Sequence, residues 1–234
     1  MSNEIHLPTK MRAVNIKEPG GPEMLEVTKV PLPTLKADDI LIKNSAVGVN
    51  RPDIAQRTGH YPVPADANPL PGLEVAGTVV AVGGEAVSWN IGDEVMGLTH
   101  GGGYAEYCIA DEETTFKIPD SLDLKQAASI PECFFTAWSN LVQRGSLKEG
   151  DSVLIHGGTS GIGLASIEIL KLFKAKIFTT VGSAEKKEFC KNIGVNYIFN
   201  YKEEDYYKEI KKKIKGLNLI LDYIGGEYIN KNIN

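Results

Sequence analysis

Hydrophobic and polar positions follow different patterns in the two halves of the chain. Up to about residue 120, short β-rich segments such as MRAVNI, DILIKNSAVGV, LEVAGTVVAVG and YAEYCIA are separated by glycine and proline turns. Runs of β-branched and aromatic residues bounded by turn residues predict strands. We therefore expect an irregular antiparallel barrel here, with one short helix at about Pro52 to Thr58.

From Asp123 onward the pattern changes to helices and then to alternating strands and helices. DLKQAASI and ECFFTAWSNLVQRG predict two helices, the second ending at Gly145 after Arg144. Strands that alternate with helices of ten or so residues indicate a parallel, doubly wound sheet. The predicted strands lie near residues 152–155, 176–181, 197–199 and 217–222, and the helices near 162–173, 184–193 and 203–214.

These two patterns predict an α/β protein with domains at residues 1–131 and 132–234. A complete dinucleotide fold has six strands in the order 3-2-1-4-5-6, and four are visible here. Two further strands with their helices would need about 60 more residues. We therefore expect an incomplete sheet in a C-terminally truncated chain, whose final INKNIN supplies no capping element.

A glycine-dense turn, HGGTSGIG, joins the strand that ends near His156 to the following helix. Its glycines allow the backbone to approach a pyrophosphate, and the helix N-terminus offers free amides and a positive dipole. A purely structural glycine turn remains the alternative. The predicted cofactor contacts are Gly158, Thr159, Ser160, Gly161, Ile162 and Gly163.

Two other chemistries with similar sequence patterns are excluded. A phosphate-binding P-loop requires Lys and Ser or Thr after its final glycine, whereas Leu164 and Ala165 follow Gly163. A hydrolase with Ser160 as nucleophile would require glycine at the position of Ile162.

The end of the second predicted strand bears on the choice of dinucleotide. An acidic residue normally closes this strand and binds the ribose of NAD, but here Val181 and Gly182 are followed by Ser183, with Lys186 and Lys187 shortly after. A hydroxyl and two cations suit a 2′-phosphate, so NADP is preferred over NAD. The alternative is that Ser183 only caps the next helix and that the lysines are solvated.

Composition narrows the class of protein further. The chain of 234 residues carries a net charge of −5, which gives no support to nucleic-acid binding. Cys108, Cys133 and Cys190 are widely spaced and odd in number, which favours a reduced, cytoplasmic setting over a disulfide framework. No apolar run reaches the length of a membrane span, so we expect no membrane association.

Taken in order, the motifs resemble the quinone oxidoreductase branch of the medium-chain dehydrogenase/reductase superfamily, the group that includes zeta-crystallin. The motifs that carry the resemblance are KEPGGPEMLEV, VGVNRPDIAQRTGHYP, LPGLEVAGTVVAVG, GDEVMGL, GGGYAEY, AASIPECFFTAW, HGGTSGIG, TVGSAEKK, FNYKEED and LILDYIGG. The resemblance implies a GroES-like β-barrel domain followed by a partial Rossmann domain. It also implies NADPH-dependent reduction of a quinone-like small molecule, and a homo-oligomer for full-length relatives.

The resemblance also assigns residues. Gly182, Ser183, Lys186 and Tyr201 would hold the adenosine 2′-phosphate of NADPH, and Thr136 would lie near the nicotinamide. Asn50 and Tyr61 match active-site positions, although the phenol of Tyr61, in the loop HYPVP, could equally be a packing group.

No metal is expected. Zinc-dependent relatives have a cysteine where Asn50 stands and a histidine where Leu73 stands, and neither residue here can replace those ligands. Glu74 alone cannot hold a catalytic zinc, which needs three protein ligands. We expect Glu74 to make a structural or orienting hydrogen bond instead.

Several alternatives stay open. His156 could move protons beside the turn, but packing is favoured, and nothing in the sequence pairs His60 or His100 with a carboxylate. The same site could serve an enoyl thioester instead of a quinone. A non-catalytic NADPH-binding protein or a truncated product is the remaining alternative.

Overall fold

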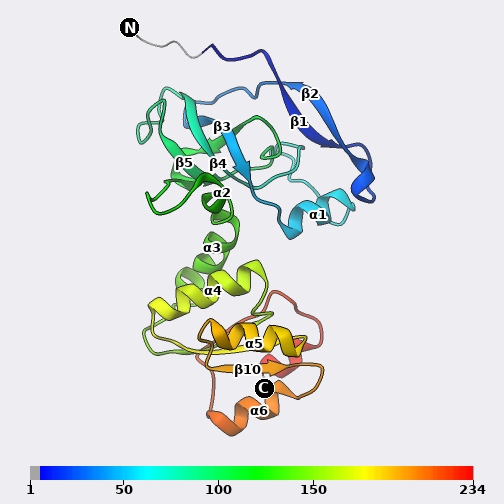
Figure 1. Cartoon of the computed structure of the whole chain (residues 1–234), viewed down its shortest axis with the longest axis vertical. Helices are drawn as coiled ribbons and strands as arrows, with labels where there is room; N and C mark the ends of the chain where they lie inside the picture. Colours follow the sequence, from blue (N-terminus) through cyan, green and yellow to red (C-terminus); the bar gives the residue numbers. More distant parts are fainter. Residues whose placement is uncertain (1–5, 234) are drawn as a thin grey trace. The chain divides into compact units, whose positions relative to one another are not determined.

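Antiparallel strands form the first unit of the computed structural model, which describes residues 6–233 (Figure 1). The chain separates into two compact units between Glu132 and Cys133. The first contains a two-stranded ribbon, β1-β2, and a five-stranded sheet in the order β6-β3-β4-β5-β7. Its strands are β1 (Lys10–Ile16), β2 (Leu25–Pro31), β3 (Asp39–Val47), β4 (Glu74–Val82), β5 (Glu94–Leu98), β6 (Tyr107–Asp111) and β7 (Thr115–Lys117).

The core of this unit lies on the central strands β3 and β4. Ile40, Ile42, Val75 and Val79 are completely buried. The register between β3 and β4 shifts at two places, Leu41/Ile42 and Asn44/Ala46, and such irregularities bend a strand and increase its twist. The sheet is therefore curled.

Helices are short in the first unit and lie in its connections. The helix α1 (Arg51–Arg57) connects β3 to β4, and short 3-10 turns, η1 (Pro22–Met24) and η2 (Glu112–Thr114), precede β2 and β7. The helix α2 (Leu124–Ala127) is capped by Asp123, whose side chain accepts a hydrogen bond from the Gln126 amide at 2.8 Å. The connection through α1 brings the side chains of Asn50 and Asp53 to the start of β4.

The second unit is built on a parallel sheet in the order β10-β9-β8-β11. Its strands are β8 (Ser152–His156), β9 (Lys176–Val181), β10 (Tyr197–Asn200) and β11 (Leu219–Leu221). The chain moves outward from β8 to β10 and then returns to the other side of β8. Ligands of open α/β sheets bind at the carboxyl ends of the strands beside such a reversal, here between β8 and β11.

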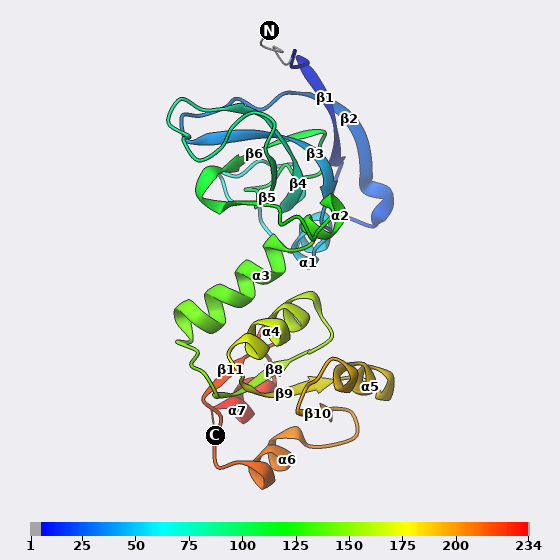
Figure 2. The same ribbon diagram turned by 60° about the vertical axis from the view of Figure 1, so that its left-hand side comes forward.

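Helices cover both faces of this sheet, because β8 and β9 bury side chains on each side. Val153 and Ile155 pack with α3, α4 and α5, whereas Leu154 and Phe178 pack with α6 and α7. Figure 2 shows α4 and α5 on one side of the strands and α6 on the other. The helices are α3 (Pro131–Trp138), which continues as the π-helical segment η3 (Ser139–Arg144), α4 (Gly161–Leu172), α5 (Ala184–Asn192), α6 (Tyr206–Lys213) and α7 (Tyr228–Asn232).

The predicted fold class is confirmed, and the errors are local. The helix α6 begins at Tyr206 rather than near Glu203, because the amides of Glu203 and Glu204 close a turn on the Asn200 carbonyl. Near the chain end a short helix, α7 (Tyr228–Asn232), forms that the sequence patterns did not predict. Within residues 6–233, no helix is both long and apolar enough to cross a membrane.

Candidate functional site: a dinucleotide turn and a polar cluster

The predicted glycine turn joins β8 to α4, and its geometry requires glycine at several positions. Gly157 has φ = +72°, in the left-handed region that favours glycine. A Cβ on Gly158 would collide with the Thr179 side chain, and one on Gly163 would collide with the Gly157 carbonyl. Ser160 caps α4, its hydroxyl oxygen accepting a hydrogen bond from the Gly163 amide at 3.0 Å.

Donors remain available at this helix end. Within the described residues, the backbone amides of Thr159, Gly161 and Ile162 donate no hydrogen bond to the protein. They lie at the N-terminus of a 12-residue helix, where the dipole favours an anion. The residues present therefore fit the pyrophosphate of a dinucleotide.

Of the four residues assigned to a 2′-phosphate, Gly182 and Ser183 follow β9, Lys186 lies in the first turn of α5, and the Tyr201 phenol lies beside Gly182. A Cβ on Gly182 would lie 2.8 Å from the Tyr201 hydroxyl oxygen, so the end of β9 and the Tyr201 phenol are in close contact. Ser183 caps α5, accepting a hydrogen bond from the Lys186 amide at 3.3 Å. The side chains of Lys186 and Tyr201 are both exposed.

The two lysines that follow are not equivalent. Lys187 forms an ion pair with Glu204 at 2.7 Å, so one of the two cations counted in the sequence is already paired with a carboxylate. None of the ion pairs in the described chain involves Lys186. Lys186 is therefore the lysine available to a ligand.

The remaining predicted cofactor residue, Thr136, lies in α3. Its side chain is half-buried, and its carbonyl accepts a hydrogen bond from Asn140 Nδ2 at 2.8 Å. A Cβ on Gly161 would lie 2.7 Å from Cys133 Sγ, so the start of α3 packs against the start of α4. Thr136 is one helical turn beyond this contact.

His156 is completely buried at the end of β8. Its Nε2 lies 3.0 Å from Asn232 Oδ1, and its Nδ1 lies 3.1 Å from Thr180 Oγ1. Asn232 Nδ2 donates to Asp222 at 2.9 Å, which leaves Oδ1 as the acceptor, so the Nε2 nitrogen of His156 carries a proton. Burial lowers the pKa of His156. These contacts agree with packing rather than proton transfer.

In the first unit, Asn50 is held by two carboxylates. Its Nδ2 donates to Glu74 Oε1 at 2.7 Å, and its backbone amide donates to Asp53 Oδ2 at 2.7 Å. Glu74 is only 2% exposed, and its Oε2 accepts a hydrogen bond from the Glu132 amide at 2.9 Å. The orienting hydrogen bond expected of Glu74 is therefore confirmed. Burial raises the pKa of Glu74, and its hydrogen bonds with Asn50 and Glu132 oppose that shift.

Asp53 and Tyr104 extend this cluster, and the sequence reasoning missed both. Besides the Asn50 amide, Asp53 accepts hydrogen bonds from the Gly72 amide at 3.2 Å and the Tyr104 hydroxyl at 3.0 Å. Burial and the neighbouring Asp53 raise the pKa of Tyr104. The spacing of Asn50 and Asp53 is that of a capping box and could have identified Asp53; no local signal identifies Tyr104.

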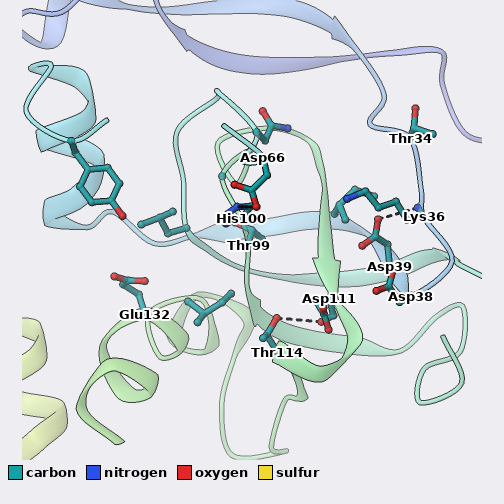
Figure 3. Close-up of a pocket in the computed structure, with 16 residues that line it drawn as sticks. Thr34, Lys36, Asp38, Asp39, Asp66, Thr99, His100, Asp111, Thr114 and Glu132 are labelled. Carbon is teal, nitrogen blue, oxygen red and sulfur yellow. Dashed lines mark hydrogen bonds and ion pairs between the residues drawn. The ribbon is translucent and has the colours of Figure 1, made fainter. Parts of the chain in front are cut away.

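A cavity of about 650 Å³ opens beside this cluster (Figure 3). Tyr61, which is 43% exposed, lines the cavity together with Leu73 and Glu132, whereas Asn50 is not among the lining residues. Glu132 is also a residue that sequence reasoning missed. Burial, with the charges of Glu74 and Asp53, raises the pKa of the Glu132 carboxyl.

One prediction about the histidines is wrong. His100 lies 3.3 Å from Asp66, so the expectation that no carboxylate pairs with it is wrong. These residues are 34 positions apart in the chain, and only the folded loops bring them together (Figure 3). His60 instead contacts the Thr58 hydroxyl at 3.0 Å.

The positions of zinc ligands in related enzymes hold Asn50 and Leu73, and both oxygens of Glu74 accept hydrogen bonds. Among residues 6–233, no group of three His, Cys, Asp or Glu side chains could hold a metal ion.

Comparison with known proteins decides the family. The chain is 37% identical over 228 residues to the quinone oxidoreductases of Pongo abelii and Homo sapiens, covering 96% of this chain and 69% of each relative. The chain belongs to the quinone oxidoreductase family. Residues 36–120 of this oxidoreductase match the alcohol dehydrogenase GroES-like domain, and residues 161–234 match the family described as zinc-binding dehydrogenase.

Solved structures agree with this assignment. The CurK enoyl reductase superimposes on the oxidoreductase with a TM-score of 0.86 at 29% identity, covering 97% of this chain and 70% of that one. The quinone oxidoreductase from Coxiella burnetii gives a TM-score of 0.81 at 31% identity, covering 93% and 70%. The protein is thus an oxidoreductase of a nicotinamide-dependent dehydrogenase family.

Proposed function

We propose that this protein uses NADPH, without a metal ion, to reduce quinones or related conjugated carbonyl compounds. The observation that carries the cofactor assignment is the grouping of Gly182, Ser183, Lys186 and Tyr201 at the end of β9. There a hydroxyl, an ammonium and a phenol can all donate to a 2′-phosphate. Gly182 replaces the acidic residue that would bind the NAD ribose and would repel this phosphate.

Lys186 and Lys187 provide a matched pair to test this assignment. Lys186→Ala should weaken NADPH binding much more than NADH binding, because only NADPH carries the 2′-phosphate. Lys187→Ala, which removes the cation already paired with Glu204, should change the NADPH affinity much less. Calorimetric titration of both variants with both cofactors measures this, and an equal loss of NADPH and NADH affinity in Lys186→Ala would refute the assignment.

The substrate class is inferred from the residues at the positions where zinc-dependent relatives have their metal ligands. Asn50 and Leu73 provide no metal ligation, so we propose that no Lewis acid activates a simple ketone. An easily reduced acceptor, such as a quinone, then fits the site better. NADPH, when bound, would supply the hydride. The Tyr61 phenol at the cavity would hydrogen-bond the substrate oxygen, and the Asn50 amide, held by Glu74, would polarise it.

An enoyl thioester is the second candidate, favoured by the similarity to the CurK enoyl reductase. Stopped-flow oxidation of NADPH with a naphthoquinone, compared with a crotonyl thioester, separates the two. We expect faster turnover with the naphthoquinone. Faster turnover with the thioester would establish the alternative, and binding of NADPH without turnover of either would favour a non-catalytic protein.

Three further proposals concern the whole molecule. We propose that residues 1–131 form the catalytic domain and residues 132–234 the cofactor domain. We propose a cytoplasmic location, because the three cysteines are odd in number and widely spaced, which favours a reduced setting. We also propose homo-oligomers for full-length members of this family, as the resemblance implies.

A further inference from the structure

Tyr223 lies against the glycine turn, 63 residues away from Ser160 in the chain. It follows β11, at the strand reversal beside β8, and its side chain is 38% exposed. Its hydroxyl donates to the Gly157 carbonyl at 2.9 Å and lies 2.5 Å from Ser160 Oγ. Neither sequence patterns nor the family motifs assigned a role to this residue.

The hydrogen bonds around Tyr223 can be assigned one by one. The Gly157 carbonyl can only accept, so the phenolic hydrogen points to it. The Ser160 hydroxyl then donates its own hydrogen to the Tyr223 oxygen, while its oxygen accepts from the Gly163 amide at 3.0 Å. Both hydroxyl hydrogens are therefore held within the turn in this structure.

The same two hydroxyls stand beside the available amides of α4. A hydroxyl hydrogen rotates about its C–O bond, so the Tyr223 hydrogen can turn from the Gly157 carbonyl to a phosphate oxygen while Ser160 still donates to the Tyr223 oxygen. Burial raises the pKa of Tyr223, so the phenol keeps its proton at neutral pH. The turn thus combines backbone donors with a rotatable phenolic donor.

We propose that Tyr223 is a ligand of the cofactor pyrophosphate, donating to it alongside the amides of the glycine turn while Ser160 donates to the Tyr223 oxygen. This inference rests on the proposed dinucleotide cofactor and extends it by one side chain from β11. Both NADPH and NADH carry the pyrophosphate, so the contribution of Tyr223 is the same for both. That property separates Tyr223 from Tyr201 at the 2′-phosphate end.

The test compares Tyr223→Phe with Tyr201→Phe by calorimetric titration of the whole chain with NADPH and NADH. A hydrogen bond to a charged acceptor contributes enough that Tyr223→Phe should weaken both cofactors by about tenfold. Tyr201→Phe should weaken NADPH alone. Unchanged or tighter binding by Tyr223→Phe would overturn the inference, and tighter binding would mean that the phenol obstructs the turn.

A purely structural role is distinguished by phosphorus NMR of bound NADPH. We expect Tyr223→Phe to move the pyrophosphate resonances and to leave the 2′-phosphate resonance in place. Pyrophosphate resonances identical to those of the unmodified protein would overturn the inference even if affinity fell. Ser160→Ala serves as a second variant and should also weaken both cofactors. Failure of the unmodified protein to bind either dinucleotide would instead overturn the proposed function, and this inference with it.

Discussion

Replacing Glu74 by Ala should destabilise the first unit strongly, because this buried carboxylate accepts hydrogen bonds from two groups. Its removal leaves Asn50 Nδ2 and the Glu132 amide without their acceptor. Each partly buried donor that loses its acceptor costs about 1 to 3 kcal/mol. Relief from burying a carboxyl with a raised pKa offsets part of that cost, so we expect a net loss of about 2 to 4 kcal/mol.

Two variants control this prediction. Glu74→Gln keeps the side-chain volume and one acceptor, so its stability should fall between those of the unmodified protein and Glu74→Ala. Glu106→Ala also removes an acceptor of two hydrogen bonds, both from Arg12, but that pair is exposed to water. Exposed pairs contribute about 0 to 1 kcal/mol, so this control should change little.

Urea unfolding followed by tryptophan fluorescence measures the effect. Trp138→Phe removes the tryptophan of the second unit and leaves Trp89 to report on the first. With a urea m value of about 2 kcal/mol/M, the middle of the usual range, the expected loss lowers the midpoint by roughly 1 to 2 M. The prediction would be refuted if the Glu74→Ala variant unfolded at the same urea concentration as the unmodified protein, or at a higher one than Glu74→Gln.

Three other changes test neighbouring features. The folded-state pKa of Glu132 is raised, so the stability that its protonated form provides is complete below about pH 4 and is lost as pH rises through that pKa. Glu132→Gln should therefore raise the melting temperature at pH 8 but not at pH 4; the reverse would contradict the assigned burial. Gly158→Ala should cost about 1 to 3 kcal/mol in thermal unfolding and abolish NADPH binding, because the new methyl meets Thr179; normal binding would contradict this. Tyr61→Phe should lower kcat/KM for naphthoquinone by about 10- to 100-fold with NADPH affinity unchanged, and an unaltered kcat/KM would exclude the phenol from the reaction.

Local patterns were sufficient to predict the elements that carry the dinucleotide turn. The apolar strand and the glycines of the turn are consecutive in the chain, and Ser183 directly precedes the helix that it caps. The backbone conformation of such segments can be predicted from the sequence, because it depends on residues that are close in the chain. These residues set the alternation of apolar positions in a strand, the φ angles of glycines and the capping of helices. The fold class and the order of the elements follow from the same patterns.

The side-chain partners could not be predicted in this way. Tyr223 reaches Ser160 across 63 positions, and Tyr104 reaches Asp53 across 51. The sequence did not identify Glu132 either, because a carboxylate in the first turn of a helix is common. Only the fold shows that Glu132 contacts Glu74. These contacts depend on the tertiary arrangement of strands and loops. A short segment of sequence does not contain that information.

The most direct test of the account is titration of the unmodified protein with NADPH and NADH under the same conditions. The grouping of Lys186, Ser183 and Tyr201 at the end of β9 predicts that NADPH binds at least about tenfold more tightly, since charge-assisted hydrogen bonds to the 2′-phosphate are absent with NADH. Equal affinities, or tighter binding of NADH, would contradict the proposed cofactor.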